Sequence, residues 1–247
     1  MKRLIATTSL LGLLATTAFA DDLKPMTDEE RALFRAEVRA YLFENPEVIM
    51  QAVEILQNRE AESQAQADFT LVSNNAEAIF NDGYSFVGGN PDGDITLVEF
   101  LDYRCGYCKR AHGEVAELLQ NDGNIRWIVK ELPILGDASV LASRFAIAVK
   151  QVAGGDSYKA VGDALMSFQG EITMPALTRL GNTFGLDMEA IEARMNSDEV
   201  TAEIATTREL AGTLAISGTP TFVMQDELLR GYLPLDQMQA IVVDKRG

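Results

Sequence analysis

The sequence predicts an α/β domain with an all-helical insertion, preceded by a separate helical segment. Residues 95–130 have the pattern of a strand, a helix and a strand, which is typical of two parallel strands joined by a right-handed crossover. Residues 137–216 carry only helical patterns, and a strand pattern resumes at residues 218–224. Residues 27–81 are also helical by pattern and precede the first strand.

The first twenty residues have the pattern of an export signal. Lys2 and Arg3 precede an apolar stretch that ends at Leu14, and an Ala-Phe-Ala cleavage sequence ends at residue 20. The apolar stretch is too short to span a membrane. We therefore expect a signal peptide at residues 1–20 and, because it resembles a bacterial Sec signal, a mature protein in the periplasm. That compartment is oxidising.

The mature chain is strongly acidic. Without Lys2 and Arg3, 19 basic side chains stand against 37 acidic ones, 19 − 37 = −18. Such a surface argues against nucleic acid or an anionic membrane as a partner. The remaining roughly 227 residues are enough for one or two domains with a sizeable core.

The N-terminal segment, residues 21–81, is predicted to contain two helices. Thr27 and the three acidic residues after it form a helix cap, and Pro46 interrupts the helix. A second amphipathic run follows, and residues 57–68 are polar but still favour a helix. The apolar residues of the first helix recur at helical spacing, at Phe34, Val38, Tyr41 and Leu42.

The apolar faces of residues 27–56 have two explanations. They pack on the protein's own core, or they meet the same faces on other copies. A short helical pair followed by a polar helix has little core of its own, so we expect a stalk-like homo-oligomer. Dimer and trimer both stay open, because Pro46 breaks the seven-residue pattern.

The elements of the α/β domain follow one another between turn signals. A turn at residues 81–83 precedes a short strand at 84–87 and a glycine-rich return at 88–93. The predicted elements are then a strand at 95–101, a helix at 105–121, a strand at 125–130, helices at 140–152, 158–168, 175–184, 188–195 and 199–214, strands at 218–224 and 228–231, and a helix at 235–243.

Two cysteines stand where the strand at 95–101 gives way to a helix. There the unpaired N–H groups and the helix dipole favour a thiolate on Cys105. Cys108, three residues later on the first helical turn, lies on the same side, so the two sulfurs are able to close into a disulfide and reopen. Cys105 is predicted to be the exposed nucleophile and Cys108 the resolving thiol.

Other uses of the Cys-x-x-Cys motif fit poorly. A structural zinc site needs four ligands, and the chain has two Cys and one His. Covalent haem attachment needs His after the second Cys, where Lys109 stands. A structural disulfide across so small a loop would constrain little. Redox chemistry is favoured, and neither a metal nor another cofactor is expected.

Three features of the chain resemble the DsbA-like thiol-disulfide oxidoreductases of the thioredoxin superfamily. They are the sequence Cys105-Gly106-Tyr107-Cys108, a later Gly-Thr-Pro-Thr sequence that contains Thr219 and Pro220, and the helical insertion between them. With the N-terminal helices added, the chain resembles the suppressor-of-copper-sensitivity C (ScsC-like) branch, whose extended members are oligomeric disulfide isomerases. The resemblance implies a thioredoxin fold over residues 82–247, with the insertion at about 137–216.

The resemblance also implies a substrate-binding surface around the cysteines. Pro220 is expected to be cis and to offer the backbone of Thr219 to an extended client strand. The alternative is a trans proline that begins an edge strand. Isomerases of this superfamily carry similar residues at three positions, which are Thr219 before the proline and Gly106 and Tyr107 between the cysteines. We therefore expect a less oxidising disulfide than in the strongest oxidases.

Glu99 is the least expected residue of its strand. Both sides of the strand are otherwise mostly apolar, so burial should raise the pKa of this carboxyl. Its position resembles that of the buried acid in thioredoxin-like enzymes, which implies a proton acceptor for Cys108, through a water if needed. The alternative is a carboxylate paired with Lys130 on the neighbouring strand. The two roles are compatible, because Lys130 matches the position of a family lysine near that acid.

His112 is the only histidine, four residues after Cys108. A protonated imidazole there would favour thiolates, and a surface or capping role is the alternative.

The function expected is a periplasmic disulfide isomerase or reductase acting on unfolded or misoxidised client proteins, with a membrane redox partner that recharges the site. One alternative is a monomeric DsbA-like oxidase. Another is a copper-handling protein with Cys105, Cys108 and Met224 as soft ligands. A third is a structural surface protein with a vestigial redox site, which predicts a fully buried or sluggish Cys105 thiol.

Overall fold

The computed structural model describes residues 25–247, so the expected signal peptide at residues 1–20 lies outside the described residues. The described chain divides into two units, residues 25–57 and residues 58–247. Among residues 25–247, no helix is both long enough and apolar enough to cross a membrane.

The described part of the first unit is helical, as predicted. Helix α1 (Asp28–Glu44) begins at Thr27, whose hydroxyl accepts from the Glu30 N–H, while the Glu30 carboxylate accepts from the Thr27 N–H. This reciprocal arrangement is the capping box that the Thr27 pattern predicts. Helix α2 (Glu47–Asn74) begins after the Asn45-Pro46 break. No residue of α1 is buried.

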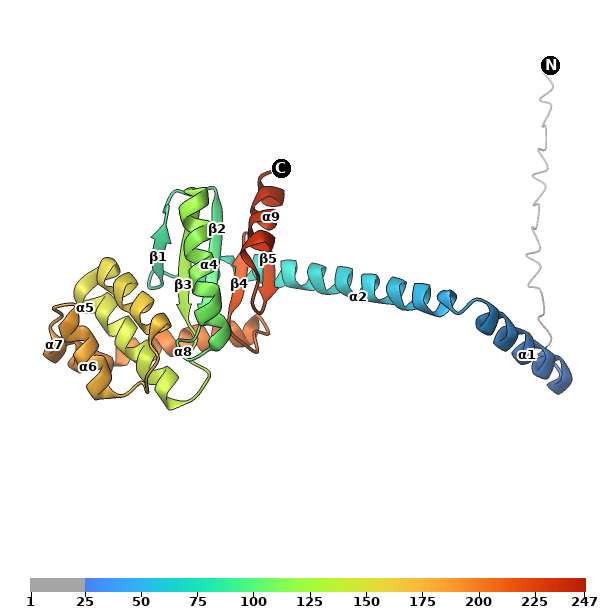
Figure 1. Ribbon diagram of the computed structural model, residues 1–247, viewed down its shortest axis with the longest axis horizontal. Coiled ribbons are helices and arrows are strands. Elements are labelled where there is room, and N and C mark those ends of the chain that lie inside the picture. The colour runs from blue at the N-terminus through green and yellow to red at the C-terminus, as the bar shows by residue number, and fades with distance from the viewer. Residues whose placement is uncertain (1–24) are drawn as a thin grey trace, which may run out of the picture. The chain divides into compact units, whose positions relative to one another are not determined.

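The second unit is built on a five-stranded sheet with the order β1-β3-β2-β4-β5 (Figure 1). Strands β2 and β3 are parallel, as predicted, and the other neighbours are antiparallel. The strand bounds are β1 Phe86–Gly89, β2 Ile95–Leu101, β3 Ile125–Glu131, β4 Thr221–Met224 and β5 Glu227–Arg230.

Alternation along β2 gives the sheet two apolar faces, each covered by helices. Ile95, Leu97 and Leu101 face the larger core, which includes residues of α4 (Gly106–Asp122), α5 (Asp137–Ser167) and α9 (Leu235–Arg246). Val98 and Phe100 face a second core formed with α3 (Ala76–Phe80), α8 (Asp198–Thr213) and the end of α2. Both faces are buried because helices cover them, which is why β2 reads as a nearly continuous apolar run.

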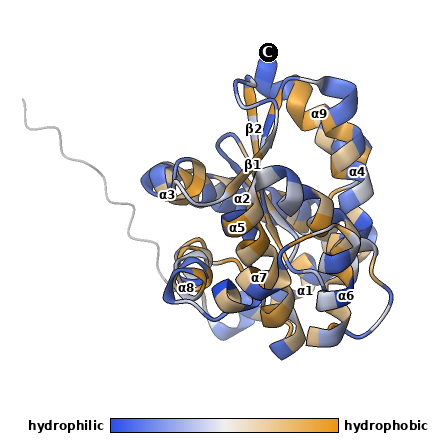
Figure 2. Cartoon of the chain, turned by 90° about the vertical axis from the view of Figure 1, so that its left-hand side faces the viewer, coloured by the Kyte–Doolittle hydropathy of each residue, from blue (hydrophilic) through white to orange (hydrophobic). Residues whose placement is uncertain are grey.

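The insertion contains only helices, as predicted. Its elements are α5 Asp137–Ser167, α6 Met174–Thr183, α7 Met188–Met195 and α8 Asp198–Thr213. Gly154, with φ 87°, breaks α5 at the glycine pair where the sequence predicts two separate helices. The many hydrophobic residues of α5 (orange in Figure 2) pack into the larger core.

Residues 58–81, which the sequence groups with the N-terminal segment, lie in the second unit. Val72 and Ile79 are buried against the second core, and the buried carboxylate of Asp68 accepts hydrogen bonds from the guanidinium of Arg230 on β5. The end of α2 is therefore part of the structure that supports the sheet.

Candidate redox site

Cys105 and Cys108 lie where the sequence predicts, at the start of a helix that follows a central strand. Cys105 is the N-cap of α4 and Cys108 lies in its first turn, and both are free thiols. Cys105 is 8% exposed and Cys108 0%. Cys105 is thus the more accessible sulfur, but it is more enclosed than the exposed nucleophile expected.

The loop before β4 encloses Cys105. The Thr219–Pro220 peptide bond is cis, as predicted. The Cys105 thiol donates to the Thr219 carbonyl oxygen, with Sγ 3.0 Å from that oxygen. The loop is held in turn by Thr221, whose hydroxyl donates to the Gly218 carbonyl at 2.8 Å. The backbone of this loop therefore lies directly against the nucleophile.

The turn between β2 and α4 is held by a residue that sequence reasoning missed, Asp102. Its carboxylate is buried and accepts from the backbone N–H groups of Arg104 at 2.8 Å, Ile134 at 2.9 Å and Leu135 at 3.1 Å. These bonds fasten the turn that presents Cys105 to the loop after β3. An acidic residue directly after an apolar strand was the available signal.

Glu99 is fully buried, and burial raises the pKa of its carboxyl to about 7 despite a hydrogen bond from Trp127. The indole Nε1 of Trp127 donates to Oε2 at 3.1 Å, whereas Oε1 has no partner among residues 25–247. Burial also raises the pKa of the Cys108 thiol, and the charges of Cys105 and Glu99 add to that increase. The burial predicted for Glu99 is confirmed.

The predicted pairing of Glu99 with Lys130 is wrong. In the β2–β3 register, Glu99 lies beside Val129 and Lys130 lies beside Phe100, so the two charges point to opposite faces of the sheet. Lys130 instead donates to the Asp82 carboxylate at 2.5 Å and to the Ala78 carbonyl at 2.9 Å. It therefore does not tune Glu99 through an ion pair.

A second buried acid, Glu131, lies on the same face of the sheet as Glu99. Its carboxylate accepts from the hydroxyls of Tyr103, Tyr158 and Ser143, each at 2.7 Å. Burial raises the pKa of Glu131 to about 7, and the charge of Glu131 contributes to the raised pKa of Glu99. Sequence reasoning missed Glu131, which directly follows the strand predicted at 125–130 and is the last residue of β3.

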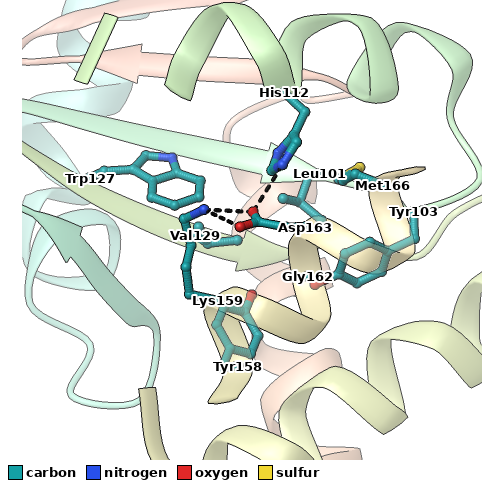
Figure 3. A pocket seen from close by; sticks show the side chains of 10 residues that line it. All are labelled: Leu101, Tyr103, His112, Trp127, Val129, Tyr158, Lys159, Gly162, Asp163 and Met166. Carbon is teal, nitrogen blue, oxygen red and sulfur yellow. Dashed lines mark hydrogen bonds and ion pairs between the residues drawn. The ribbon is translucent and has the colours of Figure 1, made fainter. Parts of the chain in front are cut away.

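His112 contacts the insertion rather than the cysteines. Its Nε2 lies 3.0 Å from Oδ1 of Asp163 on α5, and Lys159 donates to both oxygens of that carboxylate at 2.6 Å (Figure 3). Burial lowers the pKa of the imidazole, and Asp163 opposes that effect. The neighbouring small pocket is lined by Tyr103 and Trp127 among others. The imidazole is thus partly buried between two helices.

Tyr107 and Gly106 form the outer rim of the site. Tyr107 is 62% exposed, and its ring centroid lies 6.2 Å from that of Tyr232. The guanidinium of Arg110 lies over the Tyr232 ring, 4.3 Å from its centroid. The Cβ position of Gly106 is open. An exposed aromatic surface therefore stands beside the nucleophile.

The three sulfurs of the copper alternative do not converge. Met224 is at the far end of β4, four residues and about 13 Å from Pro220 at the usual rise per strand residue. In the part of the chain described, no group of three or more His, Cys, Asp or Glu residues could hold a metal ion.

Comparisons with known proteins agree with this geometry. Residues 96–243 match the family described as DSBA-like thioredoxin domain. The chain belongs to this family. Residues 30–62 match the family described as Copper resistance protein ScsC N-terminal domain. The predicted thioredoxin fold with a helical insertion, the N-terminal segment and the ScsC-like resemblance are therefore confirmed.

Three solved structures illustrate the similarity. A thioredoxin-like oxidoreductase from Silicibacter pomeroyi is 41% identical, with a TM-score of 0.65, over 69% of this chain and 96% of that one. The thiol-disulfide exchange protein alpha-DsbA2 from Wolbachia pipientis is 28% identical, with a TM-score of 0.69, over 75% and 98% of the two chains. ScsC from Proteus mirabilis in a transitional conformation is 26% identical, with a TM-score of 0.66, over 89% and 98%.

Some curated relatives are much longer proteins. A Na(+)/H(+) antiporter NhaA 3 from Salinispora tropica is 27% identical over 157 residues, which cover 64% of this chain but 24% of that protein. The DsbA-like chain thus spans about a quarter of the length of such relatives. Its fold and its free cysteine pair are those of a DsbA-like thiol-disulfide oxidoreductase.

Proposed function

We propose that this DsbA-like protein is a disulfide isomerase or reductase for client proteins, with Cys105 as the nucleophile and Cys108 as the resolving thiol. The observation that carries the proposal is the position of Cys105, at the N-terminus of α4 and 3.0 Å from the Thr219 carbonyl oxygen. The helix end favours a thiolate, and the loop offers backbone groups beside it.

The reaction uses only sulfur and proton transfers. The Cys105 thiolate attacks one sulfur of a client disulfide, a bond forms between them, and the second client sulfur leaves as a thiolate. If that client thiolate or another client thiol attacks the mixed disulfide, the client bond is rearranged and Cys105 is released. If the Cys108 thiolate attacks Cys105, the client leaves reduced and the Cys105–Cys108 disulfide remains.

Glu99 is the proposed proton acceptor for Cys108. Burial raises the pKa of the Cys108 thiol, so this sulfur attacks only if a base takes its proton. Glu99 is buried near it, its Oε1 has no partner among residues 25–247, and its pKa of about 7 suits a base that works near neutral pH. This oxygen accepts the proton from Cys108, through a water if the two groups do not touch.

The cis-proline loop is the proposed binding site for the client backbone. Thr219 and Pro220 lie against Cys105, so a client strand that pairs with this loop brings its disulfide to the nucleophile. Tyr107, largely exposed beside Gly106, offers an apolar surface for client side chains. These four residues together form the proposed substrate-binding surface.

Self-association through residues 27–56 is proposed from the surface of the first unit. α1 has no buried residue, and the match to the ScsC N-terminal domain covers much of this segment. A helical segment that exposes many large apolar side chains is unusual for a monomer. Large apolar side chains exposed in this segment are Leu33, Phe34, Val38, Tyr41, Phe43, Ile49, Met50, Val53, Ile55 and Leu56. We propose a dimer or trimer.

The periplasm is the proposed location, with a membrane protein restoring the redox state of the site. The expected signal at residues 1–20 supports export. One solved relative, from Salmonella enterica, is described as a periplasmic thioredoxin-like protein.

Refolding of a scrambled protein with several disulfides tests the function. The wild type should restore activity, and Cys105→Ser should not. Cys108→Ser should keep part of the isomerisation, because rearrangement needs only the nucleophile, but should lose net reduction of insulin. If the wild type oxidised a reduced client but repaired no scrambled one, the monomeric oxidase would replace this proposal.

A further inference from the structure

Glu131, a buried carboxylate that the thiol chemistry does not use, lies next to the active-site turn. It is the last residue of β3 and pairs in register with Leu101, the last residue of β2. Its Oε1 accepts from both Tyr103 and Tyr158, and its Oε2 accepts from Ser143, each at 2.7 Å. One carboxylate thus binds three hydroxyl groups.

The three donors come from two parts of the fold. Tyr103 lies in the turn between β2 and α4, two residues before Cys105. Tyr158 and Ser143 both belong to α5, the first helix of the insertion. Both tyrosines are buried, and both line the pocket shown in Figure 3. Glu131 therefore connects the turn that carries the nucleophile to the helical insertion.

A carboxylate is a costly way to fill this space. Removing a charged group from water destabilises the folded state unless its partners compensate, and here all three partners are neutral hydroxyls. An exact set of donors around both oxygens, by contrast, fixes the side chains that supply them, because hydrogen bonds to a charged acceptor are stronger and shorter than neutral ones. The arrangement favours order around Tyr103 at the expense of stability.

We propose that Glu131 is a positioning residue of the redox site, which holds Tyr103 and, with it, the turn that aligns Cys105 with Cys108. Asp102 holds the backbone of the same turn through the N–H groups of Arg104, Ile134 and Leu135. Glu131 holds the side chain of the next residue, Tyr103, on the side of the turn that faces the core. The inference rests on the proposed function only in that the cysteine pair closes and opens a disulfide.

Closure of that disulfide is the step that alignment controls. With glutathione attached to Cys105, the Cys108 thiolate attacks the Cys105 sulfur, the Cys105–Cys108 bond forms, and the bond to glutathione breaks. Glutathione leaves as a thiolate and takes up a proton. A loosened turn lowers the effective concentration of one sulfur at the other and makes closure slower and less favourable.

Two matched substitutions separate positioning from stability. Tyr103→Phe and Tyr158→Phe each delete one 2.7 Å hydrogen bond to the same oxygen of Glu131, so both should lower the melting temperature. In equilibrium with a glutathione buffer, Tyr103→Phe should reduce the equilibrium constant for closure at least threefold. Tyr158→Phe should change it less than twofold, because Tyr158 is on α5 and away from the turn.

Removal of the charge provides a second measurement. Glu131→Gln keeps the shape of the side chain but weakens its bonds to the tyrosines, so it should shift closure in the same direction as Tyr103→Phe. The control is Glu203→Gln, which removes another buried carboxylate, one that contacts Lys150 and Gln151 of α5. This control should leave closure unchanged.

Equal effects of the two tyrosine substitutions on closure, or no effect of Tyr103→Phe, would overturn the inference. The readout is exchange with glutathione, whereas the proposed function is tested by client refolding. A wild type that closes its disulfide but repairs no client would therefore refute the proposed isomerase and leave this inference standing.

Discussion

Replacement of Glu99 by glutamine should stabilise the reduced protein in alkaline solution and change it little in acid. Burial raises the pKa of Glu99 from its ordinary value near 4.5 to about 7. Between these values the folded state holds a proton that the unfolded chain has lost, so the wild-type free energy of unfolding falls as pH rises through this window. At about 1.4 kcal/mol per pH unit, the wild type loses about 3 kcal/mol.

Urea unfolding of the reduced protein near pH 4.5 and near pH 8 measures this effect. Glutamine does not ionise, so the difference in stability between Glu99→Gln and the wild type should grow by about 3 kcal/mol from the lower to the higher pH. Glu117→Gln, at an exposed position of α4, should show a constant difference. If the Glu99→Gln difference is also constant, the carboxylate titrates normally and the reasoning fails.

The same substitution, although it stabilises the protein in alkaline solution, should slow the release of a mixed disulfide from Cys105. Without a carboxylate at residue 99, Cys108 has no buried base, and release of a mixed disulfide from Cys105 should slow by roughly a hundredfold, as for loss of a general base. In the wild type this release should speed up as the pH rises through about 7, where Glu99 loses its proton. Stopped-flow release of glutathione at several pH values measures both effects.

Three further outcomes are expected. Asp102→Ala should lower the free energy of unfolding by about 3 kcal/mol in urea titrations, because three backbone N–H groups lose their hydrogen bonds to a charged acceptor. Asp187→Ala, which removes only a helix cap, should cost about 1 kcal/mol, and equal costs would contradict the anchoring role. Cys108→Ser should accumulate client proteins linked to Cys105 on non-reducing gels, and their absence would argue against its resolving role. Val38→Asp should convert the oligomer to a monomer in light scattering, and an unchanged molar mass would exclude α1 from the interface.

The elements that local patterns determine were predicted well. The strand at residues 95–101, the helix that begins at Cys105 and the helices of the insertion all occur within a few residues of their predicted bounds. Hydrophobic periodicity, helix caps and glycine turns depend on residues that are close together in the chain, so they can be recognised in a single sequence. The cis bond before Pro220 was predicted from the family resemblance, because nothing local distinguishes it from a trans bond.

The error at Lys130 shows what local patterns leave out. Alternation along each strand places Glu99 and Lys130 on definite faces of their own strands, but which faces coincide depends on the register between β2 and β3. The register sets Val129 beside Glu99 and leaves Lys130 with Asp82. A shift of one residue would have made the predicted pair, so the sequence alone did not decide it.

The sequence by itself determined the fold class, the two reactive sulfurs and the one acid whose apolar strand made it conspicuous. The tertiary structure decided which groups support them. Asp102 reaches N–H groups more than thirty residues away, Glu131 joins Tyr103 to α5, and His112 meets Asp163 instead of the thiols. The physical reason is that such contacts depend on how helices and strands pack across the core, and residues distant in the chain meet only once that packing exists.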